Sequence, residues 1–123
     1  LAGDGDVMMT VQEFATAVQY GIAVIVIVLD NGMYGTIRMH QERKYPGRVS
    51  ATELRNPDFA ALARSCGGHG ERVERTEEFA PAFERSLASG LPAMIHCLVD
   101  PEALTPTMTL AAIRAKALAA REG

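Results

Sequence analysis

Two turns of this sequence carry side chains that could hold a metal ion. Asp4 lies between Gly3 and Gly5, and Asn31 occupies a second turn 27 positions later. If both turns follow strands of one strand–helix–strand unit, they meet at the same edge of a parallel sheet. A carboxylate and an amide oxygen would then face one point. Such hard oxygen ligands suit Mg²⁺, which completes its octahedral shell with water and phosphate oxygens.

The segment between the two turns has the pattern of a helix followed by a buried strand. Thr10 and Glu13 have the spacing of a capping box, which predicts a helix over 10–20 and a structural role for Glu13. Residues 23–29 form a continuous apolar run rich in Val and Ile, typical of a parallel strand covered on both faces.

The rest of the chain continues this alternation of helices and strands. We predict one helix over 34–42, one with Asn56 as its N-cap, one with Thr76 as its cap, and a final helix that begins at Thr107 or Thr109. Further strands are expected over 71–74 and 92–99. Strands that alternate with helices predict an α/β fold, with a parallel sheet and helices on both of its faces.

Several segments resemble the thiamine diphosphate enzymes, and in particular their acetolactate synthase-like branch. That family carries a GDG segment and, about as far downstream, an Asn-Asn pair that opens a turn. The matching residues here are Gly3-Asp4-Gly5 and Asp30-Asn31, with similar flanks over 3–17 and 28–35. Asn56-Pro57-Asp58-Phe59-Ala60 and Gly90-Leu91-Pro92-Ala93 also fit, so the resemblance covers most of the chain.

The resemblance implies a fold, a domain and a partner for this chain. Residues 1–123 would be the C-terminal part of a diphosphate-binding domain with the thiamine diphosphate-binding fold, truncated at its N-terminus. Leu1-Ala2 would be the end of a strand already under way, and the other domains of the enzyme would be absent. The family's cofactor lies between two subunits, which implies a homo-oligomer.

The resemblance also implies a set of cofactor-binding residues. Asp4, the side-chain oxygen of Asn31 and the backbone carbonyl of Met33 would bind Mg²⁺. The backbone amides of Gly5 and Asp6, together with those of Tyr34, Gly35 and Thr36 at a helix N-terminus, would hold the diphosphate. The complete set for thiamine diphosphate and Mg²⁺ is Gly3, Asp4, Gly5, Asp6, Asn31, Met33, Tyr34, Gly35 and Thr36.

Three positions depart from the family pattern. Asp6 stands where the family often has a small residue, and Asp30 stands for the first Asn of the pair. His40 occupies a position at which acetolactate synthases tend to have Trp, so the 2-oxo acid substrate stays open. The catalytic Glu of the family belongs to a different domain, in a neighbouring subunit, so no catalytic residue is expected in this chain.

Composition restricts the possible partners. The 123 residues are 48% hydrophobic and 22% charged with a net charge of −3, which argues against nucleic acid as a partner. No apolar run is long enough for a membrane span. Cys66 and Cys97 are too few for a disulfide framework, and a cytoplasmic protein with free thiols is expected. We expect His96 to be a packed strand residue.

Three functions are compatible with these patterns. The first is the diphosphate-binding part of an enzyme that decarboxylates or joins 2-oxo acids through thiamine diphosphate. The second is a dinucleotide-binding oxidoreductase domain, because Gly3-x-Gly5 is followed by an acidic residue, Asp30, at the end of the second strand. Met8 replaces the third glycine of that motif, which argues against it. The third is a non-catalytic assembly module.

Overall fold

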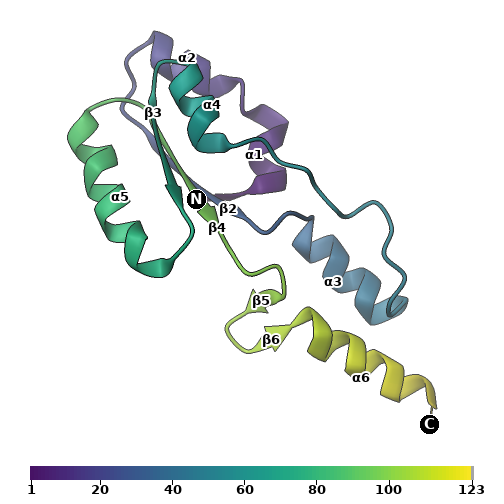
Figure 1. Cartoon of the computed structure of the whole chain (residues 1–123). Helices are drawn as coiled ribbons and strands as arrows, with labels where there is room; N and C mark the ends of the chain where they lie inside the picture. Colours follow the sequence, from purple (N-terminus) through teal and green to yellow (C-terminus); the bar gives the residue numbers. More distant parts are fainter. Residues whose placement is uncertain (123) are drawn as a thin grey trace. The chain divides into compact units, whose positions relative to one another are not determined.

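The computed structural model describes residues 1–122, which form two compact units. The sheet unit consists of Leu1–Asp30 and Asn56–Val99. The helical unit consists of Asn31–Arg55 and the chain from Asp100 onward. Figure 1 shows the elements of each unit. None of the helices within residues 1–122 is both long and apolar enough to cross a membrane.

The sheet unit is built on four parallel strands. They are β1 (Ala2–Gly3), β2 (Ile25–Asp30), β4 (Ala93–Leu98) and β3 (His69–Val73), in the order β1-β2-β4-β3. Gly3 lies beside Leu29, and Val28 lies beside His96. Because the strands are parallel, the ends of β1 and β2 reach the same edge of the sheet. Asp4, directly after β1, and Asp30, the last residue of β2, therefore lie close together at that edge.

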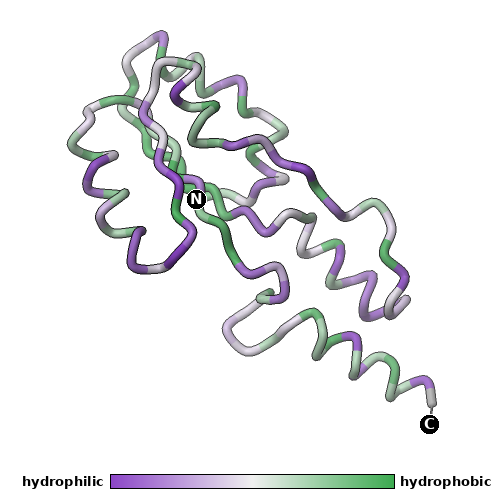
Figure 2. The backbone as a smooth tube through the Cα atoms, viewed as in Figure 1, coloured by the Kyte–Doolittle hydropathy of each residue, from purple (hydrophilic) through white to green (hydrophobic). Residues whose placement is uncertain are grey.

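Helices cover both faces of this sheet, as the sequence predicts (Figure 1). The helices on one face are α1 (Asp4–Thr10), α2 (Glu13–Gln19) and α4 (Phe59–Ser65). They pack around a core of Val7, Phe14, Val28, Phe59, Ala63 and Met94. On the other face, α5 (Thr76–Ser89) contributes to a core of Val73, Ala82, Ile95 and Cys97. Figure 2 shows the hydrophobic character of the central strands β2 and β4.

The first helical segment differs from the prediction of one helix over 10–20. The chain enters α1 directly at Asp4 and begins a second helix, α2, at Glu13. Asp6 provides the reason for the early start, because its Oδ2 accepts a hydrogen bond from the Gly3 N–H at 3.3 Å. Glu13 has a local structural role, but not the expected one: its Oε2 accepts from the Thr16 hydroxyl at 3.1 Å.

Two predicted helix caps are also wrong. The N-cap of α4 is Asp58, whose Oδ1 accepts from the Ala61 N–H at 2.9 Å, and Asn56 lies two residues before it. The N-cap of α5 is Arg75, one residue before Thr76. Glu78 is the third residue of the helix, and its carboxylate accepts a hydrogen bond from the Arg75 N–H at 3.1 Å. The side chain of Glu78 therefore caps the start of α5.

The helical unit contains α3 (Gly35–Lys44), the antiparallel pair β5 (Ala103–Thr105) and β6 (Met108–Thr109), and α6 (Leu110–Glu122). The short strand pair was not predicted from the sequence. Thr109 is the correct one of the two proposed helix starts, since its hydroxyl accepts from the Ala112 N–H at 3.1 Å.

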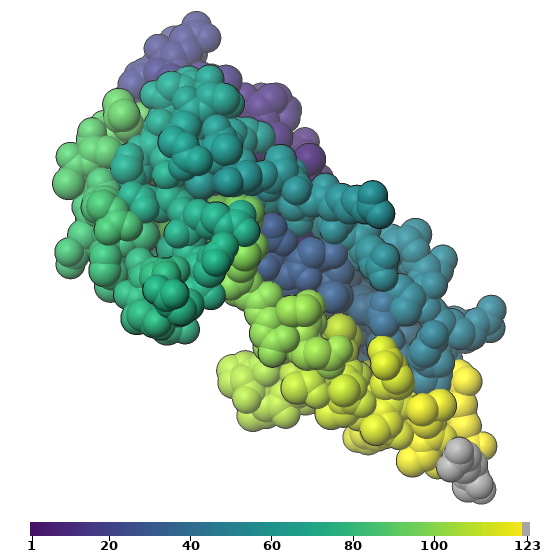
Figure 3. Space-filling view, in the orientation of Figure 1, coloured from purple at the N-terminus to yellow at the C-terminus, as the bar shows by residue number. Residues whose placement is uncertain are grey.

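Helices α3 and α6 are joined by a buried carboxylate. Glu42 on α3 is 1% exposed, and both its oxygens accept hydrogen bonds from the Arg114 guanidinium of α6, at 2.6 and 2.9 Å. Arg38 adds a bond of 2.7 Å to the same carboxylate. Figure 3 shows α6, in yellow, lying against the blue surface of α3. The pairing satisfies a charge that would otherwise be costly to bury.

Candidate functional site

Asp4 is placed by the direct passage of β1 into α1. Gly3 is the N-cap of the helix and is extended, with φ −74° and ψ 160°, so no loop separates the strand from the helix. Asp4 therefore lies at the carboxyl edge of the sheet, in the first helical turn. Its side chain is buried, with 3% of the residue exposed. A charged carboxylate in such a position needs partners that compensate for the lost water.

The carboxylate of Asp4 lies beside a second carboxylate, and one amide group contacts both. The Nδ2 of Asn56 donates to Asp4 Oδ2 at 2.6 Å and lies 2.9 Å from Asp30 Oδ1. Burial raises the pKa of Asp4, and the neighbouring Asp30 carboxyl raises that pKa further, whereas the Asn56 amide lowers it. Oxygen donors gathered in this way fit a divalent cation, which favours hard anionic ligands.

His96 extends this group of polar side chains into the sheet. The residue is 2% exposed on β4, and its Nε2 lies 2.8 Å from Asp30 Oδ2. The Phe59 ring meets the imidazole edge-on, with 5.1 Å between ring centroids. His96 is thus a buried strand residue, as expected, but it also pairs with a carboxylate at the strand ends. Its Nδ1 has no hydrogen-bond partner within residues 1–122 and lies 3.7 Å from Asp58 Oδ1.

Sequence reasoning missed Asn56 and His96 as members of this site. Asn56 looked like a helix cap because it precedes Pro57, and its contact with Asp4 spans 52 positions. The one available signal for His96 is strand register. Side chains alternate along a strand, so His96 shares a face with Met94, and its neighbour across the strands is Val28, two residues before Asp30.

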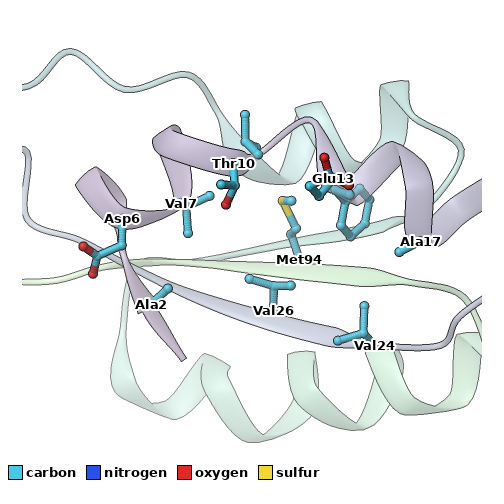
Figure 4. Close-up of a pocket in the computed structure, with 11 residues that line it drawn as sticks. Ala2, Asp6, Val7, Thr10, Glu13, Ala17, Val24, Val26 and Met94 are labelled. Atoms are coloured by element: carbon cyan, nitrogen blue, oxygen red, sulfur yellow. The ribbon is translucent and has the colours of Figure 1, made fainter.

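Asp6 behaves differently from the other predicted site residues. Its carboxylate accepts from the Gly3 N–H and so serves the start of the helix. The residue also lines a cavity of about 460 Å³ between α1, α2 and the sheet. Figure 4 shows Asp6 at one end, whereas Val7, Val26 and Met94 lie between the helices and the strands. The walls of this cavity are mainly apolar and provide few groups that could bind a diphosphate.

In the helical unit, Asn31 forms a tight local turn. Its Oδ1 accepts from the Met33 N–H at 3.1 Å, an Asx turn that fixes the amide. Gly32 has φ +68°, and its carbonyl accepts from the Leu54 N–H at 2.8 Å. The oxygen of Asn31 has two lone pairs, so this turn leaves it capacity for another contact.

The backbone N–H groups at the start of α3 differ in their hydrogen bonding. The Tyr34 N–H, which we expected to hold the diphosphate, donates to the Thr52 carbonyl oxygen at 2.9 Å. Gly35 and Thr36 begin the helix, and helix geometry gives their N–H groups no partner inside it. A Cβ on Gly35 would lie 2.9 Å from Asn31 Nδ2, so glycine keeps room for the Asn31 amide.

The predicted metal ligands therefore belong to different units. Asp4 lies in the sheet unit, and Asn31 and Met33 lie in the helical unit. Within residues 1–122, no group of three or more His, Cys, Asp or Glu side chains is arranged to hold a metal ion. The predicted ligand set contains one carboxylate, one amide oxygen and one backbone carbonyl, and its convergence on one ion stays a prediction.

Comparison with known proteins places this chain among the thiamine enzymes (thiamine pyrophosphate and thiamine diphosphate are the same cofactor). Residues 1–97 match the family described as "Thiamine pyrophosphate enzyme, C-terminal TPP binding domain". The acetolactate synthase large subunit IlvG of Mycobacterium tuberculosis is 36% identical over 106 residues, which are 86% of this chain and 19% of that protein. The acetolactate synthase isozyme 2 large subunit of Escherichia coli K12 is 35% identical over 81% of this chain and 18% of its own length.

A solved structure gives the same result. The thiamine diphosphate-dependent 4-hydroxybenzoylformate decarboxylase of Rhodococcus jostii RHA1 matches with a TM-score of 0.73 and 32% sequence identity. That match covers 80% of this chain and 19% of the decarboxylase chain. The chain thus spans about a fifth of the length of the proteins it matches. It belongs to the family of C-terminal thiamine pyrophosphate-binding domains of thiamine pyrophosphate enzymes, in its acetolactate synthase-like branch.

Proposed function

We propose that this chain binds the diphosphate of thiamine diphosphate through Mg²⁺, as part of an enzyme that acts on 2-oxo acids. The observation that carries the proposal is the buried carboxylate of Asp4 at the carboxyl edge of the sheet, beside the Asp30 carboxylate. Ligands of α/β proteins commonly bind at this edge. The family match supports the identity of the cofactor.

Charge explains why a metal ion is needed here. The diphosphate is negatively charged, and so are ionised Asp4 and Asp30, so direct contact between them would be repulsive. A divalent cation converts that repulsion into attraction by sharing its coordination shell between the carboxylate and the phosphate oxygens. Mg²⁺ typically binds through one or two carboxylates and the phosphates of its ligand. The oxygen donors of this chain fit that preference.

Each residue then has a defined task in binding. Asp4, the Asn31 side chain and the Met33 carbonyl bind Mg²⁺. Backbone N–H groups of Gly5 and Asp6 on α1, and of Gly35 and Thr36 on α3, hold the diphosphate oxygens. We leave Tyr34 out of the donor set because its N–H already serves the Thr52 carbonyl. Gly3 contributes by bringing the strand end and the helix start together.

The names of the relatives support a reaction on 2-oxo acids. One similar structure is a 4-hydroxybenzoylformate decarboxylase, and its substrate is an aromatic 2-oxo acid. Two relatives are named acetolactate synthases. We therefore propose decarboxylation or carboligation of 2-oxo acids for the whole protein. The bound cofactor supplies the carbanion chemistry of such reactions. This chain's own residues hold and orient the diphosphate, and the acid–base group comes from another domain.

The assembly of the whole protein follows from the same proposal. A cofactor that is held at its diphosphate by one subunit and at its ring by another requires at least a dimer. We therefore propose a homo-oligomer for the full-length protein. Nothing in the comparisons favours the dinucleotide-binding or the non-catalytic alternative.

Titration calorimetry of the full-length protein tests the proposed function. Thiamine diphosphate should bind when Mg²⁺ is present, and removal of the metal with EDTA should abolish binding. NAD should not bind under either condition. Binding of thiamine diphosphate with equal affinity in EDTA would contradict the metal-mediated contact. Binding of NAD without a metal would favour the dinucleotide alternative.

A further inference from the structure

The side-chain amide of Asn56 contacts both carboxylates at the edge of the sheet. Its Nδ2 lies 2.6 Å from Asp4 Oδ2 and 2.9 Å from Asp30 Oδ1. A primary amide has two N–H donors, so one side chain can serve both acceptors at once. The residue reaches this place from the segment that precedes α4, far from either carboxylate in sequence. Its amide thus holds both carboxylates at once.

Asp30 is held in turn by the sheet. Its Oδ2 lies 2.8 Å from His96 Nε2, and the His96 ring is enclosed on β4 with the Phe59 ring against it. The side chain of Asp30 is 10% exposed and that of His96 is 3% exposed. Both ends of the arrangement are therefore anchored: one in the strand β4, the other at the start of α1. Rotation of the Asp4 carboxylate would break the bond to Asn56.

We propose that Asn56 is a positioning residue for Mg²⁺ binding: with Asp30 and His96 behind it, it orients the carboxylate of Asp4 toward the metal. The inference rests on the proposed function. Groups that hydrogen-bond to a metal ligand commonly fix its orientation, and their loss costs roughly 10- to 100-fold in metal affinity. A neutral donor is suited to this task because it holds an anionic ligand without cancelling its charge.

A purely structural role makes a different prediction. If Asn56 only ties the segment before α4 to the sheet, its loss lowers stability and leaves the metal affinity of the folded protein unchanged. If Asn56 positions Asp4, its loss weakens Mg²⁺ binding beyond any effect on stability. Saturating Mg²⁺ should then restore thiamine diphosphate binding, because the carboxylate itself is still present.

The test uses Asn56→Leu in the full-length protein, since leucine keeps the approximate shape and removes both donors. Calorimetric Mg²⁺ titrations with thiamine diphosphate present should show roughly 10- to 100-fold weaker metal binding. Asn56→Ser keeps one hydroxyl donor, which can serve one carboxylate only, and should give an intermediate loss; it also serves if Asn56→Leu fails to fold. The thermal melting of the metal-free protein is measured in parallel.

Leu62→Ala is the matched control. Leu62 lies on α4 and packs against the same core, away from the hydrogen bonds of Asp4. This variant should lower the melting temperature and keep the Mg²⁺ affinity of the wild type. Wild-type Mg²⁺ affinity in both Asn56 variants would overturn the inference and leave the proposed function standing. Failure of the wild-type protein to bind thiamine diphosphate with Mg²⁺ would overturn both.

Discussion

At the scale of single residues, the site depends on how a few oxygen atoms are oriented. Asn31 uses its own Oδ1 to accept from the Met33 N–H, so its side chain is fixed before any ligand arrives. Asp4 is fixed through Asn56. Proposed ligands that are already oriented lose less freedom on binding, so we expect this arrangement to favour tight binding of a metal and its diphosphate.

Gly35→Ala tests the orientation of Asn31. A Cβ at this position would lie 2.9 Å from Asn31 Nδ2 and 3.8 Å from the Leu104 side chain, so the Asn31 amide has to turn away. We expect the affinity for Mg²⁺ and thiamine diphosphate to fall about tenfold. Calorimetry measures the change, and Thr36→Ala, which adds no atoms at the next position, should bind as the wild type does. An unchanged affinity in Gly35→Ala would show that Asn31 is not a ligand.

At the scale of elements, close contact between α4 and β3 shapes the sheet unit. A Cβ on Gly70 would overlap the Ala60 carbonyl oxygen and lie 2.9 Å from the Ala60 Cα. The helix therefore rests directly on the backbone of the strand. Because backbone atoms cannot move aside as a flexible side chain can, any larger residue at position 70 has to push α4 away.

We accordingly predict that Gly70→Ala lowers the free energy of unfolding by about 3 kcal/mol, the upper range for overpacked sites. Gly90→Ala is the comparison. Gly90 ends α5 with φ +63° and open space around it, so alanine there costs about 1 kcal/mol of backbone strain. Chemical denaturation measures both values. If both variants lost the same free energy of unfolding, α4 would be able to move away from β3 without destabilising the protein.

The contact between α3 and α6 should depend on pH. The Arg114 guanidinium, with help from the Gly47 N–H and Arg38, lowers the pKa of Glu42 from its ordinary value of 4.5 to about 2. A carboxyl whose pKa is depressed by folding stabilises the folded state fully above pH 4.5 and loses that contribution as the pH falls toward 2.

Glu42→Gln measures this contribution. At neutral pH the variant should be less stable than the wild type by roughly 3 kcal/mol, because the arginine charges lose their buried partner. Thermal unfolding followed by circular dichroism should show that the difference in stability between the two proteins becomes smaller as the pH falls from 4.5 to 2. Glu77→Gln, in an exposed ion pair, should show little effect at any pH. A difference in stability that stays constant between pH 4.5 and 2 would refute the account of Glu42.

The elements also show what the sequence could predict. Continuous apolar runs gave β2 and β4 correctly, because parallel strands covered on both faces must be apolar on both. Helix starts were less predictable, because several side chains compete for the same backbone N–H groups. Asn56 and Asp58 both suit a cap, and the choice between them is made by Asp4 and Asp30, which are far away in sequence.

At the scale of the whole molecule, the family and the sheet could be predicted from two turns and their flanks. The hydrogen bonds that hold the Asp4 carboxylate could not be predicted in this way. Asn56 and His96 join the site through strand order and register, and these depend on packing across β1, β2 and β4. Likewise, the strand pair β5–β6 is too short for periodicity to reveal.

The purified 123-residue chain should not turn over 2-oxo acids by itself. Under the proposed function its residues hold the diphosphate, and we expect the acid–base group of the reaction in another domain. We expect no decarboxylation of pyruvate or benzoylformate in the presence of thiamine diphosphate and Mg²⁺. The full-length protein is the positive control. Turnover by the chain alone would show that a catalytic group lies within it.

The central claim is that Asp4 binds the Mg²⁺ that holds the diphosphate. Its most direct test is a calorimetric titration of the full-length Asp4→Ala protein with thiamine diphosphate and Mg²⁺. Glu13→Ala, which removes a carboxylate of α2 that accepts from the Thr16 hydroxyl, is the control. We predict that Asp4→Ala abolishes binding while its circular dichroism spectrum stays that of the wild type, and that Glu13→Ala still binds. Wild-type affinity in Asp4→Ala would contradict the account.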